Sequence, residues 1–115
     1  MESSDLTDGR RAQLAARLPD ALDELSGPVS GTVELPLHLA WSGLRAFNLE
    51  KPRLRMGLYR IVLAEGMRED LVRFLDAGTL VAQWPVLRTL VGPAVRDVWE
   101  SAFGELAAAA QSAAA

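Results

Sequence analysis

The segment from Pro52 to Glu65, PRLRMGLYRIVLAE, constrains the fold of this chain more than any other segment. Proline suits the first position of a helix, where no backbone N–H is needed, and Gly66 suits its end because glycine readily adopts a left-handed conformation. The sequence therefore predicts one helix over 52–65. At about 100° per residue, its apolar side chains fall on two opposite faces, Leu54, Leu58, Ile61 and Val62 on one and Met56, Tyr59 and Leu63 on the other.

A helix that is apolar on two sides usually lies between layers of other elements. Helical spacing also appears on both sides of this segment, over 10–18, 20–25, 68–76, 80–91 and 93–110. We expect Thr79 to cap the helix over 80–91, and Pro85 to kink it or to divide it into two short helices that meet at Trp84. The expected fold is mainly α, a small bundle of four to five helices with one extended N-terminal segment.

That extended segment covers about residues 33–41, where Val33, Leu35, Leu37, Leu39 and Trp41 alternate with Glu34, Pro36, His38 and Ala40. A period of two is typical of a strand, and Pro36 places it at a sheet edge because proline donates no backbone hydrogen bond. No second strand is evident in the sequence. The segment is therefore expected either to pack in extended form over the helices or to pair with another chain.

The chain of 115 residues suggests one domain with two distinct ends. Residues 1–27 are expected to form a flexible, partly helical arm, with 1–9 disordered and the whole arm able to order on a partner. Residues 28–106 would form the helical domain. The alanine-rich tail over 107–115 favours a helix but has little to bury, so it is expected to fray.

Charge is distributed unevenly along the chain, although the net charge is only -3. Residues 45–96 hold nine basic and five acidic residues, whereas the rest of the chain holds three basic and ten acidic ones. The acidic balance disfavours nucleic acid as a partner. Arg53 and Arg60 are seven residues apart and share one flank of the 52–65 helix, with Arg55 on the other flank. Because arginine suits carboxylate and phosphate groups, this arrangement fits either a solvated flank that pairs with the acidic ends of the chain or a contact with a partner.

Catalytic chemistry finds little support in the sequence. There are no cysteines, and His38 is the only histidine, so no metal site, cofactor or catalytic triad is expected. An enzyme that uses His38 with Glu65 and Glu69 remains a minor alternative. The polar N-terminus lacks a signal core and no stretch is long and apolar enough to span a membrane, so a soluble, cytoplasmic protein is expected.

A helix-turn-helix over 68–91 is the second alternative, because two helical patterns there are joined by a short turn. Its second helix would contact DNA bases through Leu80, Val81, Gln83 and Arg88. This surface is largely apolar and contains Pro85, which favours a helix of the core over a DNA-reading helix.

Four stretches resemble a group of small actinobacterial proteins, namely LPLHLAWSG at 35–43, RMGLYRIVLAEGMREDLVRFL at 55–75, WPVLRTL at 84–90 and VRDVWESAFGEL at 95–106. These proteins are similar to companions of nucleotidyltransferase-like toxins of the abortive-infection type. The resemblance implies an antitoxin that binds a partner toxin and performs no catalysis. Many such companions carry a winged helix, and this sequence shows no strand pair for a wing.

These features together favour a non-enzymatic protein-interaction module. The chain is expected to carry more apolar surface than a single copy can bury, so it would contact a partner protein and form a homodimer. The expected partner-binding residues lie in the extended segment and on the 52–65 helix: Leu35, Leu37, His38, Leu39, Trp41, Arg53, Arg55, Tyr59 and Arg60.

Overall fold

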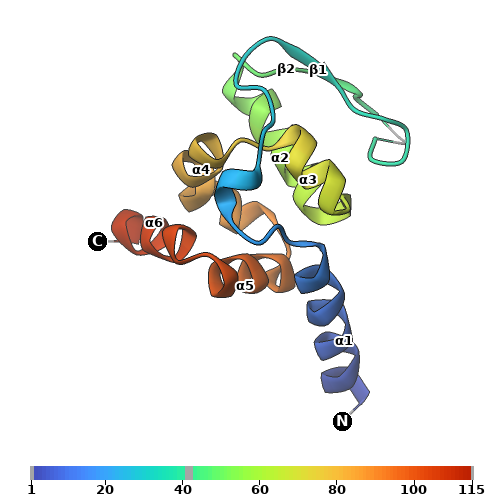
Figure 1. Ribbon diagram of the computed structural model, residues 1–115, viewed down its shortest axis with the longest axis vertical. Coiled ribbons are helices and arrows are strands. Elements are labelled where there is room, and N and C mark those ends of the chain that lie inside the picture. The colour runs from blue at the N-terminus through green and yellow to red at the C-terminus, as the bar shows by residue number, and fades with distance from the viewer. Residues whose placement is uncertain (1, 41–42, 115) are drawn as a thin grey trace.

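The computed structural model describes residues 2–40 and 43–114, and within them the chain is mainly helical, as expected (Figure 1). Six α-helices are present in these ranges, against the four to five expected, because the last predicted helix is divided at Phe103. The elements in order are α1 (Glu2–Arg17), the 3-10 helix η1 (Leu22–Glu24), β1 (Thr32–Glu34), β2 (Ala46–Asn48), α2 (Pro52–Glu65), α3 (Arg68–Phe74), α4 (Ala77–Leu90), α5 (Pro93–Ala102) and α6 (Gly104–Ala114).

Helix α2 has the bounds that the sequence predicts and lies against α3, α4 and β2. Both apolar faces contribute to the core, with Leu58 and Val62 buried on one side and Tyr59 and Leu63 on the other, whereas Leu54, Met56 and Ile61 are only partly buried. The helix thus lies between other elements of the same chain, as the sequence predicts. Gly66 ends α2 with a φ of -74°, so it is not left-handed; instead, a Cβ at this position would lie 2.6 Å from the Val62 carbonyl oxygen.

The extended segment finds its partner strand within the same chain. Strand β1 pairs antiparallel with β2, with Val33 opposite Phe47, and the Leu35 N–H donates to the Arg45 carbonyl oxygen at 2.9 Å. Sequence reasoning missed β2 because three residues are too few to show an alternating pattern. The strand also ends at Glu34, and the chain turns over 37–39, so the expected strand over 33–41 is too long.

The N-terminal segment is helical from Glu2, where disorder over 1–9 was expected. Helix α1 lies beside α5, and its Leu14 is buried in the common core (Figure 1). Further along, the Ser26 N–H donates to the Val72 carbonyl oxygen at 2.8 Å, which ties this segment to α3.

Helix α4 is one continuous helix with Pro85 inside it, and not two helices that meet at Trp84. Its N-cap is Asp76, whose carboxylate accepts from both the backbone N–H and the hydroxyl of Thr79 at 2.9 Å. Thr79 is therefore not the cap that the sequence suggested, but the group that is capped. Asp outranks threonine as an N-cap, which agrees with this outcome.

Helix α6 continues to Ala114 and so includes most of the alanine-rich tail, for which the sequence favours a helix. The helix lies beside α4, with Leu106 fully buried and Ala109 and Ala110 partly buried against the core. Small side chains let two helices approach closely, which is how an alanine-rich helix can still pack. No helix among the described residues combines enough length and apolarity to cross a membrane.

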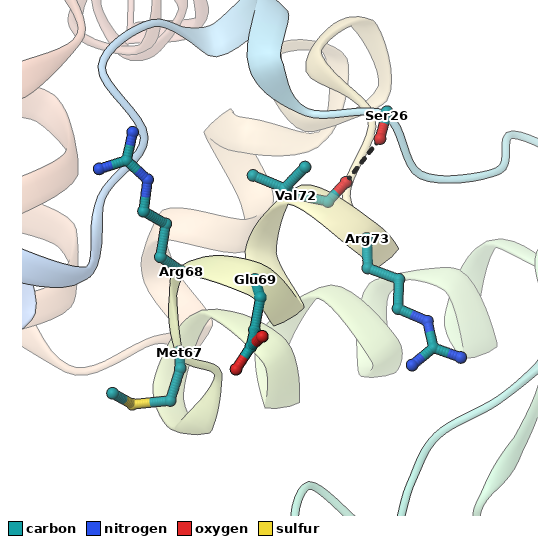
Figure 2. A pocket seen from close by; sticks show the side chains of 6 residues that line it. All are labelled: Ser26, Met67, Arg68, Glu69, Val72 and Arg73. Atoms are coloured by element: carbon teal, nitrogen blue, oxygen red, sulfur yellow. Dashed lines mark hydrogen bonds between the residues drawn. The ribbon is translucent and has the colours of Figure 1, made fainter.

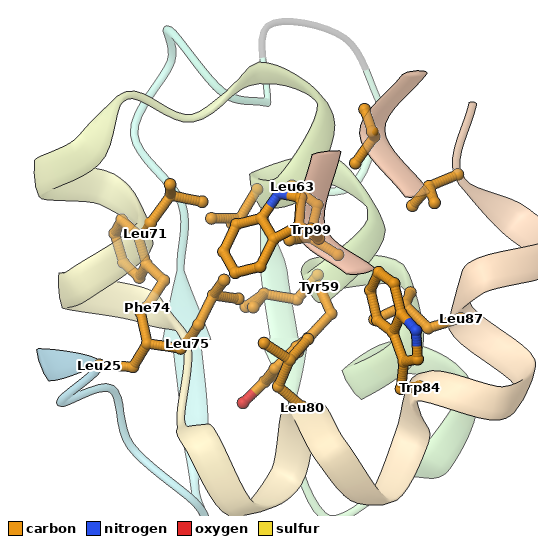
Figure 3. Packing of buried hydrophobic residues seen from close by; sticks show 14 of the residues in the cluster. Leu25, Tyr59, Leu63, Leu71, Phe74, Leu75, Leu80, Trp84, Leu87 and Trp99 are labelled. Atoms are coloured by element: carbon orange, nitrogen blue, oxygen red, sulfur yellow. The ribbon is translucent and has the colours of Figure 1, made fainter. Parts of the chain in front are cut away.

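The core gathers aromatic and leucine side chains from α2, α3, α4 and α5 (Figure 3). Trp84 and Trp99 are both fully buried, as expected of core tryptophans, and Trp99 lies 5.4 Å from Phe103 between ring centroids. The buried Trp84 Nε1–H donates to Glu100 Oε2 at 2.7 Å, so its one polar atom is satisfied. A single copy of the chain thus forms a complete core.

Candidate functional site

The surface groove between α2 and α4, called the α2/α4 groove below, has a volume of about 390 Å³. Residues 53, 56, 57 and 60 share one flank of α2 by helical spacing, and residues 86 and 90 are four apart on α4. The groove is lined by Pro52, Arg53, Met56, Gly57, Arg60, Val86 and Leu90.

The floor of the α2/α4 groove is apolar and open to solvent. Val86 is 56% exposed and Leu90 is 42% exposed, which makes them two of the large hydrophobic residues that the fold leaves uncovered. Met56 also lines the groove and is only partly buried. Neighbouring apolar side chains that remain in water are typical of a contact surface.

Two arginines border this apolar floor. Arg53 and Arg60 are both exposed, and neither takes part in an ion pair among residues 9–40 and 43–112, whose side chains the structure describes. Five other arginines do have carboxylate partners there, namely Arg11, Arg45, Arg68, Arg88 and Arg96. The sequence-based expectation that Arg53 and Arg60 share a flank agrees with this geometry.

Arg55 and Tyr59, which were also expected to bind a partner, face the interior. Arg55 donates from Nε to Gln83 Oε1 at 3.1 Å and from Nη1 to the Leu49 carbonyl oxygen at 3.0 Å. The Tyr59 hydroxyl accepts from the Asp76 N–H at 2.9 Å, and burial raises the pKa of this hydroxyl. Both side chains therefore hold α2 against the elements around it.

The extended segment contributes little to a contact surface. Leu35 and Leu39 are buried in the core of a single copy, whereas Leu37 between them is 62% exposed. Trp41 lies outside the described residues. Of the apolar residues expected to bind a partner in this segment, Leu37 is thus the one that the structure places at the surface.

His38 lies at the surface beside a buried carboxylate on α3. Its Nε2 atom is 3.1 Å from both carboxylate oxygens of Asp70, and Asp70 Oδ2 also accepts from the Met67 N–H at 3.0 Å. Asp70 is only 6% exposed, whereas Glu65 and Glu69 nearby are exposed. No sequence signal joins two residues that are 32 positions apart.

Catalysis at this pair would need further groups. No hydroxyl is hydrogen-bonded to His38 in the part of the chain that the structure describes, and Glu65 and Glu69 are both exposed. No group of three His, Cys, Asp or Glu side chains is placed to hold a metal ion within these residues. The arrangement accounts for His38 as a partner of Asp70 that holds the 37–39 turn against α3.

A larger and more open hollow of about 790 Å³ lies over α3, lined by Ser26, Met67, Arg68, Glu69, Val72 and Arg73 (Figure 2). Its cationic groups are already engaged. Arg68 makes ion pairs with Asp20 and Glu24, and the guanidinium of Arg73 lies 4.9 Å above the Phe74 ring. The two arginine side chains extend to opposite sides of α3 in Figure 2, so they do not converge on one site.

A charged network on α4 and α5 supports the fold. Arg88 donates to Glu100 at 2.6 Å and 3.2 Å, and this guanidinium lowers the pKa of the Glu100 carboxyl, with the Trp84 N–H bond acting in the same direction. Arg11 from α1 and Arg96 both pair with Asp97 and lower the pKa of its carboxyl.

The residues expected to read DNA are not available for that role. Leu80 is fully buried, Gln83 is 7% exposed, and Arg88 is held by Glu100. The chain does contain a strand pair, which sequence reasoning had missed, but β1 and β2 come before α2 and do not follow α4 as a wing would. Val81, the fourth of the residues expected to read DNA, is partly buried against the core, so all four side chains are engaged within the fold.

In comparisons with known proteins, no protein-family model, no curated protein sequence and no solved structure matches this chain. Its resemblance to companions of nucleotidyltransferase-like toxins stays a prediction.

Proposed function

We propose that this chain is a non-enzymatic protein-interaction module that docks a partner protein in the α2/α4 groove. One observation carries the proposal: exposed Val86 and Leu90 lie in a groove with two arginines that make no ion pair among the described residues. Apolar contact supplies affinity at such a surface, while arginine supplies specificity through two parallel hydrogen bonds to a carboxylate.

The resemblance seen in the sequence suggests what the partner is. An antitoxin-like companion in the cytoplasm would bind a nucleotidyltransferase-like toxin and neutralise it by covering the toxin's functional surface. Such a role needs a stable scaffold with a complementary face and requires no catalytic group. The completed core and the uncovered groove of this chain meet that requirement.

Association with a second copy is a separate part of the proposal. The sequence suggested a homodimer because the 52–65 helix is apolar on two sides and the extended segment lacks an evident partner strand. In the structure, one copy of the chain covers buried residues on both sides of that helix and supplies the partner strand. Light scattering at tens of micromolar tests it directly, because a monomer mass would contradict a homodimer and leave the docking of another protein unaffected.

The test of the docking proposal is calorimetric titration of the full chain with the product of the neighbouring gene, which we expect to be a nucleotidyltransferase-like toxin. We expect binding by the native chain and a loss of about tenfold or more in the Arg53→Glu, Arg60→Glu double variant. Arg73→Glu is the matched control, since Arg73 is an exposed arginine in the other hollow. Absence of binding by the native chain would refute the toxin as partner, and equal binding by all three proteins would refute the groove.

A further inference from the structure

Helices α2 and α4 run antiparallel along the groove, as their hydrogen bonds show. Tyr59 contacts Asp76 at the start of α4, whereas Arg55, one turn earlier on α2, contacts Gln83 two turns further along α4. The order is therefore reversed between the two helices. By the same register, Leu90 lies near Pro52 and Arg53 at one end of the groove, and Arg60 borders the other end.

This register fixes the spacing of the charges. Arg53 and Arg60 are seven residues apart on one helix, which corresponds to about 10.5 Å along the axis at 1.5 Å per residue. Met56 and Gly57 lie between them on the same flank of α2, and Val86 and Leu90 line the groove from α4. The groove thus presents a cation, an apolar stretch and a second cation along one line.

We infer that the occupant of the groove is an acidic amphipathic helix of another protein, with carboxylates at positions i and i+7 and apolar residues at i+3 and i+4. This inference rests on the proposed function and specifies the partner's chemistry. The carboxylates match the spacing of Arg53 and Arg60, and the apolar residues fall on the same face, above Val86 and Leu90.

A helix fits this groove better than an extended segment for a backbone reason. The groove is lined by side chains of two helices, whose interior N–H and C=O groups are bonded within each helix except at Pro85, which has no N–H to donate. An extended segment would find no strand edge to pair with, so its own backbone groups would be desolvated without partners. A helix satisfies its backbone internally and offers only side chains to the groove.

The sequence also shows that a second copy of this chain does not supply this helix. Among its fifteen acidic residues, Glu69 and Asp76 form the one pair that is seven positions apart. Helix α3 ends at Phe74, and the Asp76 carboxylate is occupied in capping α4, so these two residues do not lie on one helix face. The complementary charges must come from a different protein.

The experiment uses a fluorescent, designed 18-residue helical peptide with glutamates at i and i+7 and leucines at i+3 and i+4, measured by fluorescence anisotropy against the full chain. We expect saturable binding that weakens by about tenfold when both glutamates become glutamine, or when one is moved to the opposite face at i+5. A peptide of the same composition with central prolines, which cannot form a helix, should bind at least about tenfold more weakly.

Charge exchange provides the decisive comparison. The Arg53→Glu, Arg60→Glu variant should lose the glutamate peptide and bind a peptide with lysines at the same two positions, while Arg73→Glu should behave as the native chain. Equal binding of the glutamate and glutamine peptides, tighter binding of the proline peptide, or failure of the charge exchange would overturn the inference. The proposed function is tested separately. It would stand if the toxin-like protein still bound in a way that depends on Arg53 and Arg60, even when the peptide experiment overturns this inference.

Discussion

The imidazole of His38 and the carboxylate of Asp70 join the turn after β1 to α3, with Nε2 lying 3.1 Å from both carboxylate oxygens. The two groups differ sharply in environment, because the His38 side chain is more than half exposed and Asp70 is buried. Asp70 also accepts from the Met67 N–H, so one carboxylate serves both the start of α3 and the turn over 37–39.

Replacement of Asp70 by alanine should lower the free energy of unfolding by about 1–3 kcal/mol, because the Met67 N–H and His38 both lose their acceptor. His38→Ala should cost less than about 1 kcal/mol, since that side chain is largely solvated. Urea denaturation of the two single variants and the double variant measures the coupling. Glu69→Gln, on an exposed neighbour, is the control, and a larger loss in His38→Ala than in Asp70→Ala would contradict this account.

The Trp84 indole N–H depends on Glu100, which also binds Arg88. Glu100→Ala should destabilise the fold by about 1–3 kcal/mol, because a buried donor then lacks an acceptor. Glu100→Gln should cost less, since its amide oxygen can still accept from the indole. Thermal unfolding followed by tryptophan fluorescence measures both variants, and Glu105→Gln, at an exposed position of α6, is the control. Equal losses of stability in the two Glu100 variants would argue against the indole hydrogen bond.

Stability should also depend on pH through Asp97 and Glu100. Arg11 and Arg96 lower the pKa of Asp97 below its ordinary 3.8, and Arg88 lowers that of Glu100 below 4.5. A carboxyl with a lower pKa in the folded state binds fewer protons than in the unfolded state, so it contributes stability above its ordinary pKa. That contribution should disappear as the pH falls through the folded-state pKa.

Unfolding by urea at a series of pH values from 7 to 2 measures this dependence. The native chain should lose stability on acidification below about pH 4.5. The Glu100→Gln variant should start from a lower stability at neutral pH and lose less of it on acidification, since it has no proton to take up there. Parallel curves for the two proteins would show that Glu100 does not carry the effect.

Gly27 should not tolerate a side chain. A Cβ there would lie 2.4 Å from the Phe74 carbonyl carbon and 2.6 Å from the Leu75 nitrogen, and both are backbone atoms that cannot move aside. Gly27→Ala should therefore destabilise by about 1–3 kcal/mol and weaken the attachment of residues 26 and 27 to α3. Gly104→Ala, where a Cβ meets nothing within 4 Å, should leave stability nearly unchanged in the same denaturation assay.

The bounds of α2 and the mainly helical class were predicted correctly from the sequence alone, because both depend on local chemistry. Pro52 and Gly66 mark the two ends of α2, and the helical spacing of its apolar residues places side chains on two faces that both contribute to the core, as observed. The mainly helical class follows from the same periodicity in the other helices. These features depend on neighbours within a few residues, so a short stretch of sequence contains all the information needed.

Only the tertiary structure decided which distant groups meet. The pairs Val33 with Phe47, His38 with Asp70 and Arg88 with Glu100 are 14, 32 and 12 positions apart, and no local pattern indicates them. The same holds for the arginines of α2, since Arg55 finds Gln83 while Arg53 and Arg60 border an open groove. Periodicity places a side chain on one face of its own helix, but the packing of the other elements determines what that face contacts.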